Sequence, residues 1–245
     1  MSGASPGRQI AAWGVHLLTA SSAPAGILSI VAIERGDAAT AFWWMAYTIA
    51  IDSIDGTLAR AVGVKQVLPF FDGARLDDCV DYFTYVLVPA LFFLHMDVLP
   101  AGVALPVALA PVLASAYGFC RTDAKTPDHF FTGFPSYWNV VAFYLYALGW
   151  PRPLNAAIVV ALSVAVFVPV RYVYPSRTRT LRSVTVVLGL AWGALCLWML
   201  MHLATTPHAL VVLSLAFPAY SALTSGTDDV GVYTPPATTP TPALR

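Results

Sequence analysis

Long uncharged runs of apolar residues are the feature that most restricts the fold of this 245-residue chain. Charged residues make up only 11% of the sequence, hydrophobic residues make up 58%, and the mean hydropathy is +0.70. Soluble domains contain about 25% charged residues, whereas a run of roughly 20 apolar residues is long enough to cross a bilayer as a helix. A helix also satisfies its own backbone hydrogen bonds in lipid. The composition therefore predicts an all-α, polytopic membrane helix bundle.

Charged, Gly and Pro residues divide the apolar runs into about eight predicted transmembrane helices. These helices cover residues 12–33, 38–60, 73–95, 101–119, 135–149, 154–170, 183–203 and 208–223. The first run is as long as a crossing, which favours a retained membrane helix over a secretory signal. The last run is short and contains Pro218. Residues 1–225 are thus predicted to form one transmembrane domain, and the Thr- and Pro-rich residues 226–245 a disordered tail.

Acidic residues gather in one short part of the chain. Six of its 13 acids lie between positions 52 and 81: Asp52, Asp55, Asp72, Asp77, Asp78 and Asp81. The first two are three residues apart, and Asp77 and Asp81 are four apart, so each pair shares one face of a helix. One pair closes a predicted crossing and the other opens the next, so both pairs reach the same side of the membrane. Acids at the edge of a bilayer are costly and usually mark a functional site.

Four convergent carboxylates repel one another strongly in a low dielectric. Either some of them are protonated or a cation lies among them. Oxygen ligands alone suit a hard ion such as Mg²⁺ or Mn²⁺, which keeps coordination positions open for phosphate oxygens. Gly56 leaves room beside Asp55 for a ligand or a second backbone. Arg60 and Arg75 offer charge partners for phosphate or for surplus carboxylates.

The pattern D-x2-D-G-x2-A-R followed by G-x3-D-x3-D resembles that of the CDP-alcohol phosphatidyltransferases, a family of membrane enzymes. Eight positions match it: Asp52, Asp55, Gly56, Ala59, Arg60, Gly73, Asp77 and Asp81. Twelve residues separate Arg60 from Gly73, a longer gap than most members of the family have. The gap, together with A-A-W-G-V-H-L-L-T-A at 11–20 and D-H-F-F-T-G-F-P-S-Y-W-N at 128–139, resembles the bacterial branch that joins choline to CDP-diacylglycerol.

This resemblance implies that the phosphatidyl group of CDP-diacylglycerol is transferred to choline, which gives phosphatidylcholine and CMP. It implies a Mg²⁺ or Mn²⁺ site made by Asp52, Asp55 and Asp77. It assigns to Asp81 the role of base for the attacking hydroxyl, with a possible contact to the metal. The residues that it implies for nucleotide binding are Gly56, Ala59, Arg60 and Gly73.

A choline site must recognise a quaternary ammonium, which cannot donate a hydrogen bond and is bound by aromatic faces. Tyr85 follows Asp81 by one turn, and Trp44 precedes Asp52 by eight residues. The candidates for choline binding are Tyr85, Trp44 and Tyr82, with Tyr137 and Trp138 as looser candidates. For each of these residues, core packing or an interfacial aromatic belt is the alternative.

Two arginines at predicted helix ends, Arg121 and Arg171, are candidates for lipid-phosphate binding. Setting the topology and contacting headgroups is the alternative role for both. With a cytoplasmic N-terminus, eleven Lys and Arg residues fall on the cytoplasmic side, and only Arg35 and Arg152 fall on the other. This asymmetry predicts a bacterial inner-membrane protein with its acidic site at the cytoplasmic face.

The formal net charge is zero, which gives no indication of a nucleic-acid partner. The expected partners are CDP-diacylglycerol, choline and membrane lipid, and a homodimer is left open. Two other functions are also left open. The same chemistry could use serine, inositol or glycerol phosphate, although the run after Asp81, Y-F-T-Y-V-L-V-P, contains no basic residue for an anionic acceptor. A cation transporter is the other, but it would distribute its acids through the depth of the bilayer.

Overall fold

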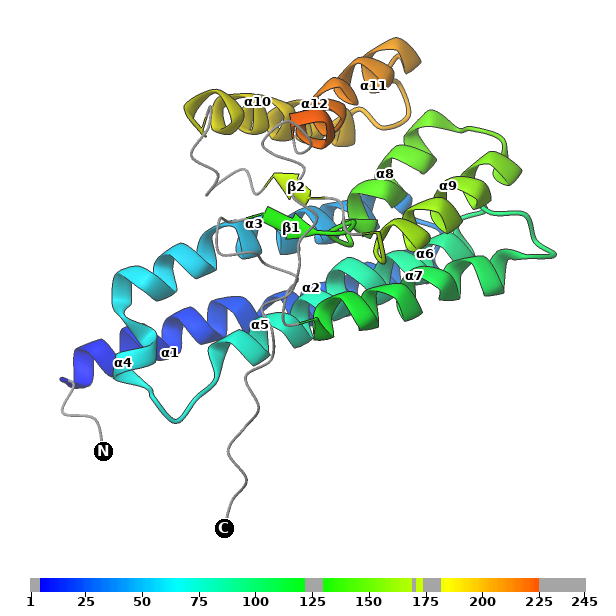
Figure 1. The fold of residues 1–245 in the computed structure, drawn as a ribbon. Helices are drawn as coiled ribbons and strands as arrows, with labels where there is room; N and C mark the ends of the chain where they lie inside the picture. Colours follow the sequence, from blue (N-terminus) through cyan, green and yellow to red (C-terminus); the bar gives the residue numbers. More distant parts are fainter. Residues whose placement is uncertain (1–4, 122–129, 169–170, 174–181, 225–245) are drawn as a thin grey trace, which may run out of the picture.

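The computed structural model describes residues 5–121, 130–168, 171–173 and 182–224 of the chain. In these ranges the chain forms a bundle of helices with one short pair of strands (Figure 1). The helical elements are α1 Pro6–Ala20, α2 Ser22–Glu34, α3 Ala38–Val62, α4 Val64–Val67, α5 Gly73–Asp81, η1 Tyr82–Leu87, α6 Val88–His95, α7 Ala104–Cys120, α8 Trp138–Leu148, α9 Arg152–Ala165, α10 Arg182–Met201, α11 His208–Ser214 and α12 Ala216–Thr224. The predicted all-α membrane fold is confirmed, while the predicted tail at 226–245 lies outside the described residues.

The first two long helical segments form an antiparallel pair. Helices α1 and α2 are interrupted only at Ser21, whose backbone N–H donates to Leu17 and Leu18 carbonyls and whose hydroxyl donates to the Leu18 carbonyl. The pair turns at Gly36, whose φ of +71° is readily adopted only by glycine. Asp37 then caps α3 by accepting a hydrogen bond from the Thr40 backbone N–H, and hydrogen bonds with Thr40 lower the pKa of this carboxyl.

The third long segment begins and ends where the sequence predicts, at Gly73 and His95. Asp72 caps it by accepting from the backbone N–H groups of Ala74 and Arg75, both at 3.2 Å. Its middle, η1, is a π-helical turn between α5 and α6, which the sequence pattern does not predict. Such turns occur often at functional sites.

Aromatic rings join α3, α6 and α8 in the core. Phe42 of α3 contacts Phe92 of α6 at 4.6 Å between ring centroids, and it contacts Phe143 and Tyr146 of α8 at 5.4 and 5.7 Å. Phe92 and Tyr146 complete the cluster at 5.6 Å. In lipid the hydrophobic effect does not drive helices together, so close side-chain packing of this kind supplies much of the attraction between them.

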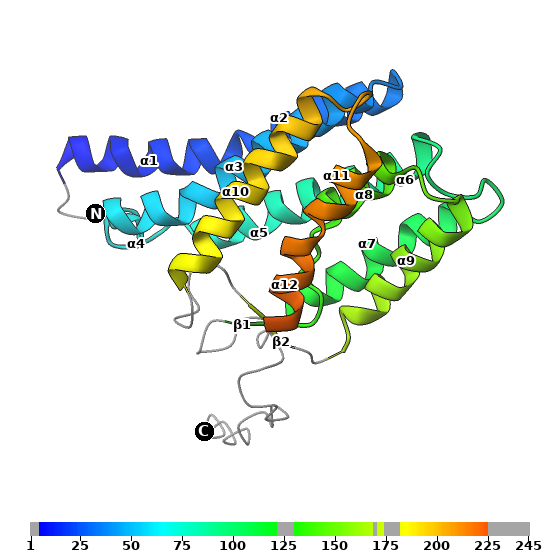
Figure 2. The same ribbon diagram turned by 90° about the horizontal axis from the view of Figure 1, so that it is seen from above.

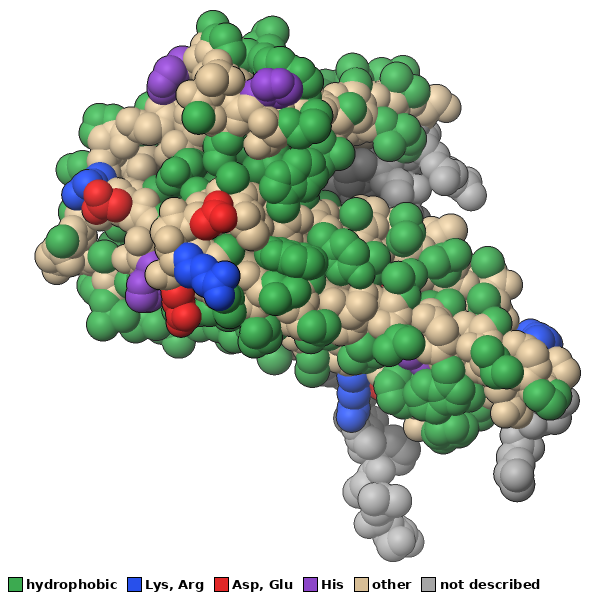
Figure 3. All heavy atoms as spheres, turned by 180° about the vertical axis from the view of Figure 1, so that it is seen from behind, with side chains coloured by type: hydrophobic (Ala, Val, Ile, Leu, Met, Phe, Trp, Pro, Cys, Tyr) green, Lys and Arg blue, Asp and Glu red, His purple; other side chains and the backbone are tan. Residues whose placement is uncertain are grey.

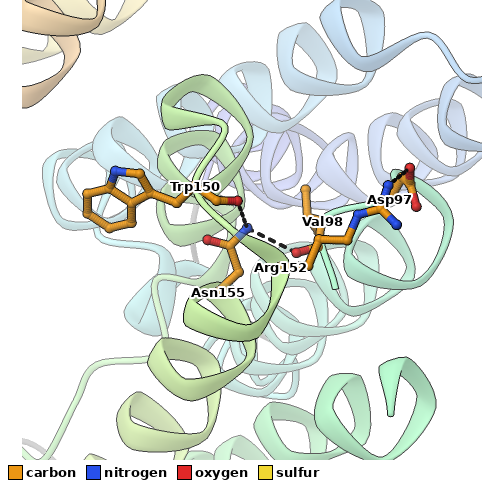
Figure 4. A network of polar contacts seen from close by, with 5 residues as sticks. All are labelled: Asp97, Val98, Trp150, Arg152 and Asn155. Carbon is orange, nitrogen blue, oxygen red and sulfur yellow. Dashed lines mark hydrogen bonds and ion pairs between the residues drawn. The ribbon is translucent and has the colours of Figure 1, made fainter. Parts of the chain in front are cut away.

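Interhelical turns gather at the two ends of the bundle. At one end, Arg152 forms an ion pair with Asp97, and the Asn155 amide donates to the carbonyls of Val98 and Trp150 at 3.0 and 3.4 Å (Figure 4). These contacts tie the α6–α7 turn to the α8–α9 turn. Beyond the C-terminal ends of α7 and α9, β1 Phe130–Thr132 pairs antiparallel with β2 Arg171–Val173, within segments predicted as loops. The alternation of turns between two ends therefore agrees with a chain that crosses repeatedly.

Within the described ranges, three helical segments are long and apolar enough to span a membrane: Pro6–Glu34, Gly73–His95 and Ser183–Met201. Helices α7, α8 and α9 are apolar but shorter. The last predicted crossing, 208–223, is divided into α11 and α12 at Leu215. Pro218 explains the break, because proline has no N–H and its ring clashes with the carbonyl four residues earlier.

Helices α10, α11 and α12 lie across the remaining bundle, with α10 packed against α3 (Figure 2). Large apolar side chains face outward from several helices, for example Leu17, Leu113 and Leu190, each at least 70% exposed. On the face shown in Figure 3, charged side chains are few and hydrophobic ones cover much of the surface. Such an apolar surface suits contact with the hydrocarbon region of a bilayer.

We expect Lys65 and Asp97, which are both exposed, to lie on opposite sides of the membrane. Helix α4 and the α6–α7 turn occupy opposite ends of the bundle (Figure 1). In a cysteine-free background, a membrane-impermeant maleimide should label only one of the two variants Lys65→Cys and Asp97→Cys in sealed spheroplasts. The other should label only after permeabilisation. Labelling of both variants from the same side would contradict this arrangement.

Candidate metal centre and active site

Three of the predicted metal ligands come together, two from α3 and one from α5. One carboxylate oxygen from each of Asp52, Asp55 and Asp77 lies within 4.8 Å of the other two. Asp55 is only 5% exposed, and the other two are partly buried. The in-phase spacing on α3 and the start of α5 at Gly73 thus produce the cluster that the sequence predicts.

Hydroxyl groups from two other segments hold two of these carboxylates. Thr19 of α1 donates to Asp55 Oδ2 at 2.7 Å. Tyr85 of η1 donates to Asp52 Oδ2 at 2.9 Å. Both donors are neutral, so they orient the carboxylates and leave the negative charge of the cluster intact. Sequence reasoning missed the contact of Thr19, although the segment 11–20 that contains it carries part of the family resemblance.

The donor set fits a hard divalent cation. It consists of carboxylate oxygens that are close enough to share one ion, and such oxygens are the ligands that Mg²⁺ and Mn²⁺ take in proteins. Hydrogen bonds to ligating carboxylates from surrounding groups are typical of metal sites. The aspartate cluster together with family membership therefore indicates a metal site.

Asp81 stands outside the group of three. It is the last residue of α5, is partly buried, and lies one turn beyond Asp77. Its carboxylate is near enough to the Tyr85 hydroxyl to interact with it electrostatically, as that of Asp52 also is.

The predicted nucleotide residues surround the cluster on α3 and α5. Gly56 is partly exposed, and a Cβ atom there would meet only the Arg60 guanidinium, 3.4 Å away. Arg60 also donates to the Thr57 hydroxyl at 2.9 Å. Ala59 packs on a small apolar cluster between α1 and α4. Because Gly56 has no side chain and few neighbouring atoms, a ligand could lie directly against the α3 backbone at this point.

Gly73 allows close contact with His16 of α1. A Cβ atom at Gly73 would lie 2.4 Å from the His16 ring, which no real side chain could tolerate without movement. His16 is buried, its ring lies 4.4 Å from that of Phe71, and its Nε2 has no hydrogen-bond partner among the described residues. The structure therefore gives Gly73 a packing role toward α1.

The choline candidates are only partly brought together. Tyr85 lies beside the cluster, and its ring is 6.1 Å from that of Tyr137. Tyr82 instead donates to the Val112 carbonyl at 2.9 Å and packs on α7. Trp44 packs edge-on against Tyr47, whose hydroxyl hydrogen-bonds with Ser21. Tyr85 and Tyr137 thus form the aromatic pair at the site, whereas Tyr82 and Trp44 contact other parts of the bundle.

The remaining charged residues that the sequence singles out lie outside the group of three carboxylates. The Arg75 side chain pairs with Asp72 at 3.2 Å, and Asp78 is exposed. The Arg121 guanidinium lies 5.7 Å from the Tyr117 ring centroid. Arg171 belongs to β2, and its side chain is outside the described part of the structure. Arg121 directly follows α7, as predicted for a helix end, whereas Arg171 begins β2 and not a helix end, because α9 ends earlier, at Ala165.

The chain is an apolar helical bundle, and it carries the aspartate motif with its carboxylates close together. These features identify it as a CDP-alcohol phosphatidyltransferase. No protein-family model matches the chain. Similarity to individual proteins over most of the chain identifies the branch of the family more specifically than the motif does. It shows that the chain belongs to the bacterial phosphatidylcholine synthases.

Three relatives named phosphatidylcholine synthase illustrate this similarity. The protein of Legionella pneumophila is 49% identical over 168 residues, which cover 68% of this chain and 66% of the relative. That of Legionella bozemanae is 47% identical over 153 residues, or 62% and 70% of the two chains. That of Rhizobium meliloti is 36% identical over 208 residues, or 84% and 86%.

We expect Thr19→Val to weaken divalent-cation binding by about tenfold, because removal of a hydrogen bond to a ligating carboxylate typically costs 10–100-fold in affinity. The metal concentration at the midpoint of thermal stabilisation by Mn²⁺ or Mg²⁺ measures this effect without a substrate. Thr19→Ser, which keeps the hydroxyl, should stay near the wild-type midpoint. An unchanged midpoint in Thr19→Val would show that the contact with Asp55 does not support the metal site.

Proposed function

We propose that this chain transfers the phosphatidyl group of CDP-diacylglycerol to choline, and that it does so at the Asp52–Asp55–Asp77 cluster. The observation that carries the proposal is the convergence of these three carboxylates within 4.8 Å. The names of the relatives supply the product, phosphatidylcholine. The alternatives with serine, inositol or glycerol phosphate use the same chemistry and are separated by experiment.

The depth of the cluster supports a lipid-linked substrate. About 21 Å of helix separate the start of α3 from Asp52, at 1.5 Å per residue. The hydrocarbon core of a bilayer is about 30 Å thick. An α3 that begins at one surface therefore keeps Asp52 below the other surface. At this depth the site can reach a pyrophosphate that is attached to diacylglycerol.

Asp52, Asp55 and Asp77 would hold Mg²⁺ or Mn²⁺, which when bound neutralises charge on the pyrophosphate and on the departing CMP. Thr19 and Tyr85 keep two of these carboxylates in place. Asp81 accepts the proton of the choline hydroxyl as its oxygen attacks the lipid-bearing phosphorus and the bond to CMP breaks. The family resemblance assigns this role to Asp81, and its position one turn beyond Asp77 on α5 supports the assignment.

Choline binds in this proposal against the faces of Tyr85 and Tyr137. A quaternary ammonium over an aromatic face is stabilised by roughly 0.5–2 kcal/mol. The negative charges of Asp52 and Asp81 add a longer-range attraction for the same cation. Gly56, Ala59, Arg60 and Gly73 are proposed for the nucleotide, and Arg121 and Arg171 for lipid phosphate.

The acidic site is proposed to open to the cytoplasm. Arg8, Arg60, Lys65 and Arg75 all belong to the end of the bundle that carries α4 and the start of α5 (Figure 1). Arg152 pairs with Asp97 at the other end. Basic residues are retained preferentially on the cytoplasmic side, where CMP is released and a soluble alcohol is available.

The proposed reaction is tested with purified protein, labelled CDP-diacylglycerol and a panel of choline, serine, inositol and glycerol phosphate. We expect phosphatidylcholine and CMP in equal amounts with choline and a divalent cation. An excess of chelator should abolish both products. If another alcohol gave product at an equal or higher rate, choline would not be the preferred acceptor. Activity in excess chelator would contradict the metal role.

We expect Asp81→Asn to lower kcat by at least about 100-fold, because general-base catalysis contributes roughly 10²–10⁴ to rate. Binding of CDP-diacylglycerol should change by less than about threefold. Asp78→Asn is the matched control, since Asp78 is a nearby exposed acid of the same helix. If Asp81→Asn instead loses nucleotide-lipid binding, Asp81 acts mainly as a ligand and not as the base.

A further inference from the structure

Asn139, in the first turn of α8, carries a buried hydrogen-bond donor that the fold leaves unused. Its side chain is 2% exposed, and its Nδ2 has no partner among the described residues. Its Oδ1 accepts from the Val140 backbone N–H at 2.8 Å. That N–H lies in the first helical turn and has no helical acceptor, so it fixes which way the amide points. The unused atom is therefore the N–H₂ group.

The register of α8 places this donor near the active site. Asn139, Phe143 and Tyr146 follow one another at helical spacing and share a face of α8. Phe143 and Tyr146 of this face pack on Phe42 of α3.

Ring contacts at two points along α8 show in which direction this helix runs relative to η1 and α6. Tyr137 lies beside Tyr85, and Tyr146 lies beside Phe92 farther along both segments. Helix α8 therefore runs parallel to η1 and α6, and Asn139 lies at the level of Tyr85. Tyr85 itself donates to the metal-ligand candidate Asp52.

The segment that leads into α8 is held in a strained shape. Ser136 has a φ of +59°, which is unusual for a residue other than glycine, and it is buried. Its hydroxyl hydrogen-bonds with Ser115 of α7 at 2.8 Å. The indole of the fully buried Trp138 donates to the same Ser115 oxygen at 2.8 Å. Backbone strain that the surroundings maintain is typical of binding sites, and here it fixes Tyr137 and Asn139 on either side of Trp138.

We propose that the Asn139 amide donates a hydrogen bond to a substrate oxygen in the acceptor subsite, beside Tyr85 and Tyr137. The inference rests on the proposed function. A positively polarised N–H would repel the ammonium group of choline, so the amide cannot face that group. The partner is an oxygen, either the hydroxyl of choline or a phosphoryl oxygen of CDP-diacylglycerol, and both offer the same acceptor chemistry.

The test compares two variants of the full-length protein in the choline assay. Asn139→Asp keeps the oxygen that accepts from Val140 but removes the donor, and Asn139→Leu removes both. Each should raise KM for one substrate by about tenfold, the loss expected for one hydrogen bond of this kind. A rise in KM for choline identifies the hydroxyl as partner, whereas a rise for CDP-diacylglycerol identifies the phosphoryl oxygen.

Asn155→Leu is the matched control. Asn155 is equally buried, but its amide already donates to the Val98 carbonyl at the opposite end of the bundle. The control should lower Tm and leave both KM values unchanged, while Asn139→Asp should lower Tm less. Unchanged KM values for both substrates in Asn139→Asp and Asn139→Leu would overturn the inference. Failure of the proposed function is distinct, because wild-type protein would then make no phosphatidylcholine.

Discussion

The mutual repulsion of three carboxylates at the junction of α3 and α5 is the constraint on which the rest of the structure depends. Two unit charges 4 Å apart repel by about 4 kcal/mol at the effective dielectric near a protein surface. Asp52, Asp55 and Asp77 approach one another to within 4.8 Å. The fold holds them with neutral hydroxyls from Thr19 and Tyr85, which orient the charges without cancelling them. A divalent cation bound among the three acids would relieve this repulsion, which is why the cluster indicates a metal site.

Parts of the site that depend on spacing within one helix could be predicted from the sequence. The three-residue spacing of Asp52 and Asp55 places both on one face, and Gly73 marks where the next helix begins. Contacts between distant segments could not be predicted in this way. Thr19 lies 36 positions before Asp55, and no local pattern distinguishes its hydroxyl from that of any other threonine in an apolar helix. The π-helical turn at Tyr85 likewise changes the phase on which a helical prediction relies.

The choline candidates are positioned by contacts that helical phase alone does not predict. Trp44 shares only an approximate phase with Asp52, because eight residues correspond to about 800° of rotation, or 80° beyond two full turns. The buried stripe of α3 passes through Met45 and Thr48, so Trp44 falls beside it and packs on Tyr47. Tyr82 precedes the π-helical turn, and its hydroxyl is taken by Val112. Tyr137, only a looser candidate from the sequence, reaches the site because a strained turn at Ser136 redirects the chain.

Both ends of the bundle contain buried polar groups, but the described residues of the site end leave more of them without partners. At the end that joins the α6–α7 and α8–α9 turns, the amide nitrogen of Asn155 donates to two backbone carbonyls, and its Oδ1 is buried without a partner among the described residues (Figure 4). Toward the acidic site, His16 Nε2 and Asn139 Nδ2 are buried without partners among the described residues. A buried polar atom without a partner costs about 1–3 kcal/mol, and two of them accompany carboxylates that already repel one another. In the proposed function, bound ligands complete these hydrogen bonds and balance this charge, which offsets the cost at the site end.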